Sequence, residues 1–148
     1  MMLHRVLTFW GKQAGDPEHR FIDACPPAAL EAAAIAAIRS YEEDGLVERA
    51  REIGTLLTEV LGAMAADPRI GEVRGRGAMM AIEFVDPETG HPDAALASRV
   101  AAATHAAGVI VLTCGTYGNV IRFLPPLAIS DDLLREGVQV VADALAAA

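Results

Sequence analysis

Residues 70–84 read IGEVRGRGAMMAIEF, and their apolar residues alternate with a period of two. In an extended chain, Met80, Ile82 and Phe84 share one face, whereas Met79, Ala81 and Glu83 share the other. The glycine that follows each arginine in 74–77 is typical of a tight turn between strands, and we favour this interpretation over an anion-binding nest. The segment therefore predicts a short strand over 70–74 that pairs with a longer one over 78–85.

A second pair of strands is predicted further along the chain. Residues 109–112 (VIVL) form an apolar run typical of a buried strand, residues 113–119 a Gly-rich loop, and residues 120–124 (VIRFL) the next strand, which ends at Pro125-Pro126. Tight connections between neighbouring strands favour antiparallel pairing.

Four helices surround these strands in the sequence. An alanine-rich helix is predicted from Pro27 to about Glu43, and an amphipathic one from Leu46 that stops at Asp67-Pro68. Asp93 is a suitable N-cap for a helix that ends at Gly108, and Ser130 for the last helix, whose predicted inner face includes Leu133. The predicted fold class is α+β, a short antiparallel sheet with helices packed on it.

Composition limits the function. The 148 residues carry 12 basic and 20 acidic side chains, a net charge of −8 that argues against a nucleic-acid-binding surface. No apolar run approaches the roughly 20 residues that span a bilayer, so a cytoplasmic protein is expected. Cys25 and Cys114 and the four histidines show no ligand spacing, and we predict no metal site.

Residues 1–25 differ in character from the rest. They have no sustained period and contain Lys12, the only lysine of the chain. We predict a poorly ordered or unrelated segment over 1–25 and one folded domain over 26–148.

Arg122 is the most informative single residue. It lies in the middle of an apolar strand, where a guanidinium must be paired with a carboxylate or lie at the mouth of a pocket. Two interpretations are open: an internal ion pair, for which Glu83 is the natural partner, or bidentate capture of a substrate carboxylate.

The loop before Arg122 contains Cys114, Gly115, Thr116 and Tyr117. Its small and polar residues suit a loop that approaches a ligand, and also a plain hairpin connection. It is not a phosphate loop, because it lacks the required glycine and lysine spacing and does not open a helix.

Segments 70–84 and 107–127, preceded by the helix junction at 42–50, resemble the carboxyl-terminal domain of class III pyridoxal-phosphate aminotransferases. The resemblance covers about residues 29–146, and several linked motifs occur in the same order. It implies the small domain of a fold type I enzyme, which closes over pyridoxal 5'-phosphate held by a large domain within a dimer. It also implies transfer of an amino group from an ω-amino acid such as 4-aminobutyrate to a 2-oxo acid such as 2-oxoglutarate.

The resemblance also assigns roles to residues. Arg122 would receive a carboxylate of the substrate, and Cys114, Gly115, Thr116 and Tyr117 would form part of the pocket wall. The partners implied are a large pyridoxal-phosphate-binding domain or a second subunit, so a homo-oligomer is expected.

The chain departs from the family pattern in the parts that hold the cofactor. The Schiff-base lysine, the aspartate for the pyridinium nitrogen and the stacking aromatic have no counterpart, and 21–27 (FIDACPP) replace the segment with the phosphate-binding threonine. We therefore expect a piece of an aminotransferase, from a truncated or split gene, that neither holds the cofactor stably nor reacts alone. The alternative is a non-catalytic α+β module for small-acid binding or oligomerisation.

Overall fold

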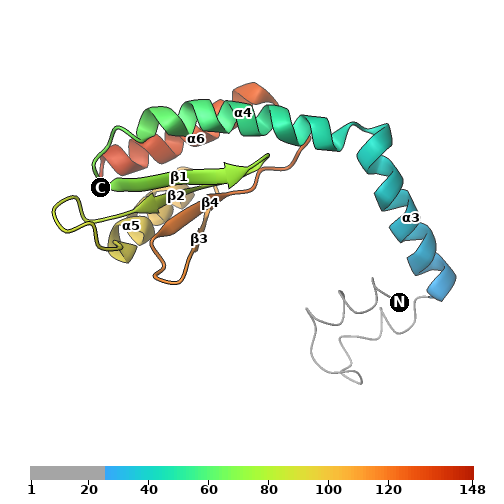
Figure 1. The fold of residues 1–148 in the computed structure, drawn as a ribbon, viewed down its shortest axis with the longest axis horizontal. Coiled ribbons are helices and arrows are strands. Elements are labelled where there is room, and N and C mark those ends of the chain that lie inside the picture. Colours follow the sequence, from blue (N-terminus) through green and yellow to red (C-terminus); the bar gives the residue numbers. More distant parts are fainter. Residues whose placement is uncertain (1–25) are drawn as a thin grey trace, which may run out of the picture. The chain divides into compact units, whose positions relative to one another are not determined.

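The computed structural model describes residues 26–148. The elements follow the predicted order (Figure 1): α3 (Pro27–Glu43), α4 (Leu46–Met64), β1 (Ile70–Arg76), β2 (Met79–Phe84), α5 (Ala94–Ala106), β3 (Leu112–Cys114), β4 (Val120–Phe123) and α6 (Asp131–Ala146). The predicted α+β class is thereby confirmed. The predictions for residues 1–25, including Lys12 and Cys25, concern a segment outside the described residues.

The chain divides into two compact units between Val47 and Glu48, and each is described by itself. In the first unit, α3 begins with proline, which suits a first helical turn, and continues with alanine, the best helix former. Gly45, with φ of 62°, follows its C-cap residue Asp44. None of the α3 residues is buried.

The second unit contains one four-stranded sheet in the order β1-β2-β4-β3, with every neighbouring pair antiparallel. The hairpin between β1 and β2 turns at Gly77, whose φ of 56° is a conformation that glycine adopts readily. The sequence therefore correctly predicted a tight turn after Arg76.

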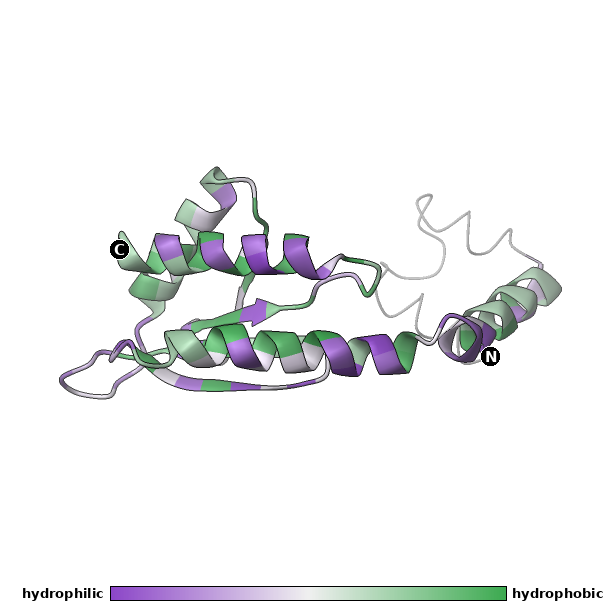
Figure 2. Ribbon diagram, turned by 90° about the horizontal axis from the view of Figure 1, so that it is seen from above, coloured by the Kyte–Doolittle hydropathy of each residue, from purple (hydrophilic) through white to green (hydrophobic). Residues whose placement is uncertain are grey.

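The core lies against one face of this sheet. Met80, Ile82 and Phe84 of β2 and Phe123 of β4 are buried with the apolar side chains of α4, α5 and α6. Apolar and polar residues alternate along α4 and α6 (Figure 2), as expected of helices that bury one face. The opposite face of the sheet carries the charged side chains.

The predicted helix caps are confirmed. The Asp93 side chain accepts a hydrogen bond from the Leu96 amide at 2.8 Å, and the Ser130 hydroxyl accepts one from the Leu133 amide at 3.3 Å. Both bonds satisfy amides that a helix start leaves without partners.

The predicted buried strand over 109–112 is wrong in position and only partly right in burial. β3 comprises only Leu112–Cys114, so Thr113 and Cys114 belong to a strand and not to the loop. Residues 109–111 precede β3 and belong to no strand. Ile110 is 85% exposed and Leu112 52% exposed, whereas Val111 is 6% exposed and belongs to the core. Leu133 was predicted on the inner face of α6 but is 56% exposed.

Within residues 26–148, no helix has the length and apolar character needed to span a membrane.

Candidate functional site

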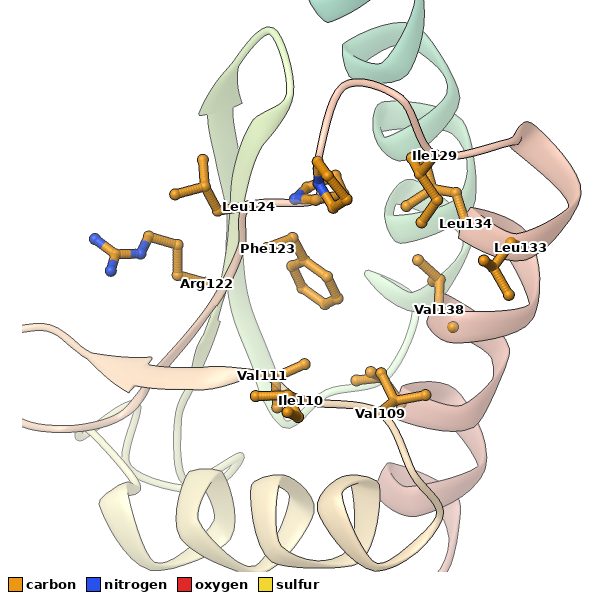
Figure 3. A pocket seen from close by; sticks show the side chains of 14 residues that line it. Val109, Ile110, Val111, Arg122, Phe123, Leu124, Ile129, Leu133, Leu134 and Val138 are labelled. Atoms are coloured by element: carbon orange, nitrogen blue, oxygen red, sulfur yellow. The ribbon is translucent and has the colours of Figure 1, made fainter.

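Arg122 lies near the middle of β4, where its backbone pairs with Ala81 of β2 on one side and Leu112 of β3 on the other. Figure 3 shows its guanidinium pointing away from the side of the strand that Phe123 faces. Because Phe123 is part of the core, Arg122 belongs to the charged face of the sheet.

The Arg122 guanidinium has a buried donor without a partner. Its Nε atom is buried, and no group within residues 26–148 accepts a hydrogen bond from it. Leaving a buried polar group unsatisfied costs about 1–3 kcal/mol, more for a charged group, so such a donor is poised for an acceptor.

The ion pair between Arg122 and Glu83 that the sequence allowed is not formed. The Glu83 carboxylate instead accepts a hydrogen bond from Arg74 Nη1 and, through Oε1, one from Asn119 Nδ2 at 3.3 Å. The Arg74 guanidinium, and to a lesser degree the Asn119 amide, holds the pKa of Glu83 below its usual value, although partial burial acts in the opposite direction. Glu83 is therefore a carboxylate at neutral pH and is already bound.

Asn119 joins the loop before β4 to β2. Its side chain is buried, and Nδ2 also donates to the Phe84 carbonyl at 2.8 Å, while the Phe84 amide donates to the Asn119 carbonyl at 2.8 Å. The same loop turns at Gly115 and Gly118, which have φ of 86° and 69°. These contacts fix the start of β4 at Val120. They thereby also fix the position of Arg122, which follows Val120 by two residues.

A shallow cavity of about 280 Å³ lies on the charged face of the sheet next to Arg122. It is lined by side chains of β1, β2 and β4 together with Cys114 and Gly115. The structure thus brings two of the four predicted loop residues to Arg122. Thr116 and Tyr117 do not line this cavity, and the Tyr117 side chain is 68% exposed.

A second cavity, of about 210 Å³, lies on the other side of β4 (Figure 3). Residues 109–111, the end of β4 and one face of α6 line it, mostly with apolar side chains. Arg122 is also one of its lining residues, but Figure 3 shows the guanidinium directed away from the cavity. A carboxylate that binds the guanidinium would therefore approach it from the charged face of the sheet.

The sequence assigned the arginines of 74–77 to a structural turn, and it gave neither Arg74 nor Asn119 a role in the site. The alternating pattern predicts that Arg74 and Glu83 lie on the two strands of one hairpin. Which residues of these strands lie opposite each other depends on the position of the turn, which the pattern alone does not fix. No group of three or more metal-ligating side chains occurs in the part of the chain that the structure describes.

The comparisons with known proteins agree with this architecture. The family described as "Aminotransferase class-III" matches residues 26–145. The 4-aminobutyrate aminotransferase of Mycobacterium tuberculosis is 58% identical over 116 residues, which are 78% of this chain and 26% of that protein. The 5-aminovalerate aminotransferase of Pseudomonas putida is 41% identical over 137 residues, which are 85% of this chain and 32% of that protein.

Solved structures show the same similarity. An aminotransferase from Bacillus anthracis superposes with a TM-score of 0.72 at 29% identity, over 82% of this chain and 28% of that one. The chain thus spans about a quarter of the length of the curated relatives it matches first. With the family match covering most of its residues, the chain belongs to the class III aminotransferases.

Proposed function

We propose that residues 26–148 are the small domain of a pyridoxal-phosphate-dependent aminotransferase and that Arg122 receives a carboxylate of its substrate. The amino donor would be an ω-amino acid such as 4-aminobutyrate, and the acceptor a 2-oxo acid such as 2-oxoglutarate. In support, curated relatives that are 58% identical bear the name 4-aminobutyrate aminotransferase.

The observation that carries the proposal is the buried Nε of Arg122, which has no acceptor within residues 26–148. The nearby acid that could neutralise it, Glu83, is bound to Arg74 and Asn119, and a cavity opens beside it. The planar fork of arginine forms two parallel hydrogen bonds with a carboxylate, a geometry that a lysine ammonium cannot reproduce. Both the donor and the acceptor named above carry such a carboxylate.

The described residues do not fit the covalent attachment of pyridoxal phosphate. This cofactor supplies an electron sink for carbanion chemistry and is held by a lysine, and none of residues 26–148 is a lysine. We therefore propose that the lysine and the cofactor belong to a large domain, in the same polypeptide or in a second subunit of a homo-oligomer. These residues would bind and orient the substrate and would not react alone.

The length of the donor is a separate question, because relatives named for 4-aminobutyrate and for 5-aminovalerate both match. Those two donors differ by one methylene, which a pocket typically discriminates by only about 1–3 kcal/mol. We favour 4-aminobutyrate on the higher identity of the relatives that bear its name.

A hybrid enzyme tests the role of Arg122. Residues 26–145 of this chain would replace the matching segment of the M. tuberculosis relative, and Arg122→Lys would be made in that hybrid. Charged hydrogen bonds contribute about 1.5–3 kcal/mol each, so kcat/KM for 2-oxoglutarate should fall roughly tenfold or more while the melting temperature changes little. Arg99→Lys, at an exposed position of α5, is the matched control and should change neither.

A large fall in melting temperature with unaltered acceptor kinetics would contradict the role of Arg122, since it would indicate a purely structural guanidinium. The alternative of a non-catalytic module for small-acid binding or oligomerisation makes a different prediction. In that case the hybrid would fold and would show no transamination before any substitution is made.

A further inference from the structure

We propose that Arg74 is a positioning residue: by holding Glu83, it keeps Arg122 available to a carboxylate ligand. The part of this inference that concerns the ligand rests on the proposed function. The part that concerns Glu83 stands on the sheet register alone.

The register places Glu83 between two arginines. Arg74 of β1 and Arg122 of β4 both pair with Ala81 of β2, one from each side. Glu83 follows Ala81 by two residues and points to the same face, so it is a diagonal neighbour of both guanidinium groups. Diagonal neighbours in an antiparallel sheet lie within reach of long side chains. One carboxylate therefore has two possible partners.

The structure shows which partner Glu83 takes. One carboxylate oxygen accepts from Arg74, and the other accepts from Asn119 at 3.3 Å, whereas Nε of Arg122 has no acceptor within residues 26–148. Arg74 also donates to Glu72 at 2.6 Å on its own strand. Ala81, which separates the two arginines, has no side-chain group that could bridge them.

Removal of Arg74 should therefore redirect Glu83. The Glu83 side chain is only 27% exposed, so its carboxylate is destabilised when it loses its cationic partner. An ion pair with the remaining nearby cation would relieve this cost. That cation is Arg122. Once Glu83 occupies the guanidinium, a ligand carboxylate must displace it before it can bind, and its affinity falls.

The first experiment follows the carboxyl of Glu83 by NMR in the 148-residue chain across a pH titration. The pKa of Glu83 should lie below its ordinary value of 4.5 in the unmodified chain, in Arg122→Gln and in Arg74→Gln, because one arginine remains in each. It should rise toward that value only in Arg74→Gln/Arg122→Gln. A return to the ordinary value in Arg74→Gln alone would overturn the proposal.

Two further variants serve as controls for this measurement. Arg76→Gln removes the next arginine on the same face of β1, which forms no ion pair within the described residues, and should leave the Glu83 titration unchanged. Arg74→Met keeps the apolar stem of Arg74 and should reproduce Arg74→Gln.

The second experiment titrates the same proteins with glutarate, a dicarboxylate. Glutarate should bind about tenfold more weakly to Arg74→Gln than to the unmodified chain, and Arg74→Gln/Glu83→Gln should restore the affinity. Weakening that persists in the double variant would overturn the proposal, because Glu83 would not be the competitor. Failure of the unmodified chain to bind glutarate would count against Arg122 as a carboxylate receptor, while the NMR titration would still decide the position of Glu83.

Discussion

At the scale of single residues, Asp67 and Arg69 connect the loop before β1 to the end of α6. Arg69 Nη2 donates to the Asp67 carboxylate at 2.7 Å and to the Leu145 carbonyl at 3.0 Å, and the Arg69 amide donates to Asp67 Oδ1 at 2.9 Å. The Arg69 guanidinium lowers the pKa of Asp67 from its ordinary value of 3.8. The unfolded chain then binds more protons at low pH than the folded one does.

Asp67→Asn should therefore destabilise the fold in a pH-dependent way. The interaction is fully present above the ordinary aspartate pKa and is lost as the pH falls through the lower pKa of the folded state. At pH 6 the free energy of unfolding in urea should fall by about 1 kcal/mol relative to the unmodified chain, and the difference should shrink progressively below about pH 4. Glu88→Gln, on an exposed turn, should have little effect at either pH. A difference that stays constant with pH would contradict this account.

At the scale of the elements, α4 packs on the β1–β2 turn through two glycines. A Cβ atom added to Gly54 would lie 2.6 Å from the Gly77 carbonyl oxygen, closer than real Cβ contacts occur. The absence of a side chain at Gly54 therefore sets how closely the helix approaches the hairpin that carries Arg74.

Gly54→Ala should force these elements apart, whereas Gly62→Ala on the same helix should not. Overpacking of this kind costs about 1–3 kcal/mol of unfolding free energy. Gly62 is exposed, and an added Cβ there meets nothing within 4 Å, so its replacement should stabilise the helix by up to about 1 kcal/mol. Urea unfolding of the two variants measures both effects. Equal effects of the two substitutions would show that the close approach to Gly77 is unimportant.

The elements themselves could largely be predicted from the sequence, because their signals are local. The period of two in β2 and the caps Asp93 and Ser130 need only neighbouring residues to be recognised. An apolar run does not reveal which of its residues the rest of the fold covers, so Ile110 was wrongly predicted to be buried although its neighbour Val111 is buried. That distinction depends on tertiary packing, which residues close in sequence do not specify.

The site could be predicted only in part, because some of its features have local sequence signals and others depend on the strand register. Arg122 is noticeable as a charge within an apolar strand, but the partner of Glu83 depends on register. A shift of one residue in the β1–β2 pairing would move Arg74 to the other face. Asn119 gives no local signal either, since its buried amide bonds a strand 35 residues away.

At the scale of the whole molecule, α3 exposes apolar side chains that a soluble protein usually covers. Ile35, Ile38 and Tyr41 are 51%, 67% and 55% exposed, and their three-residue spacing makes them neighbours on the helix surface. We therefore expect the 148-residue chain to associate with itself when it is purified alone.

Light scattering coupled to size-exclusion chromatography tests this expectation. The unmodified chain should elute as a dimer or larger species at micromolar concentration, and Ile35→Gln/Ile38→Gln should shift it toward the monomer. Ala36→Gln, on another face of α3, should not. A monomer in all three cases would contradict the expectation.

The central claim is that residues 26–145 act as the small domain of an aminotransferase. The most direct measurement of it is the rate at which the unmodified hybrid with the M. tuberculosis large domain transfers the amino group of 4-aminobutyrate to 2-oxoglutarate. At 58% identity to the segment replaced, and with the charged face of the sheet intact, we predict a kcat/KM within about tenfold of the parent enzyme. A hybrid that folds and binds pyridoxal phosphate yet transfers no amino group would contradict the claim.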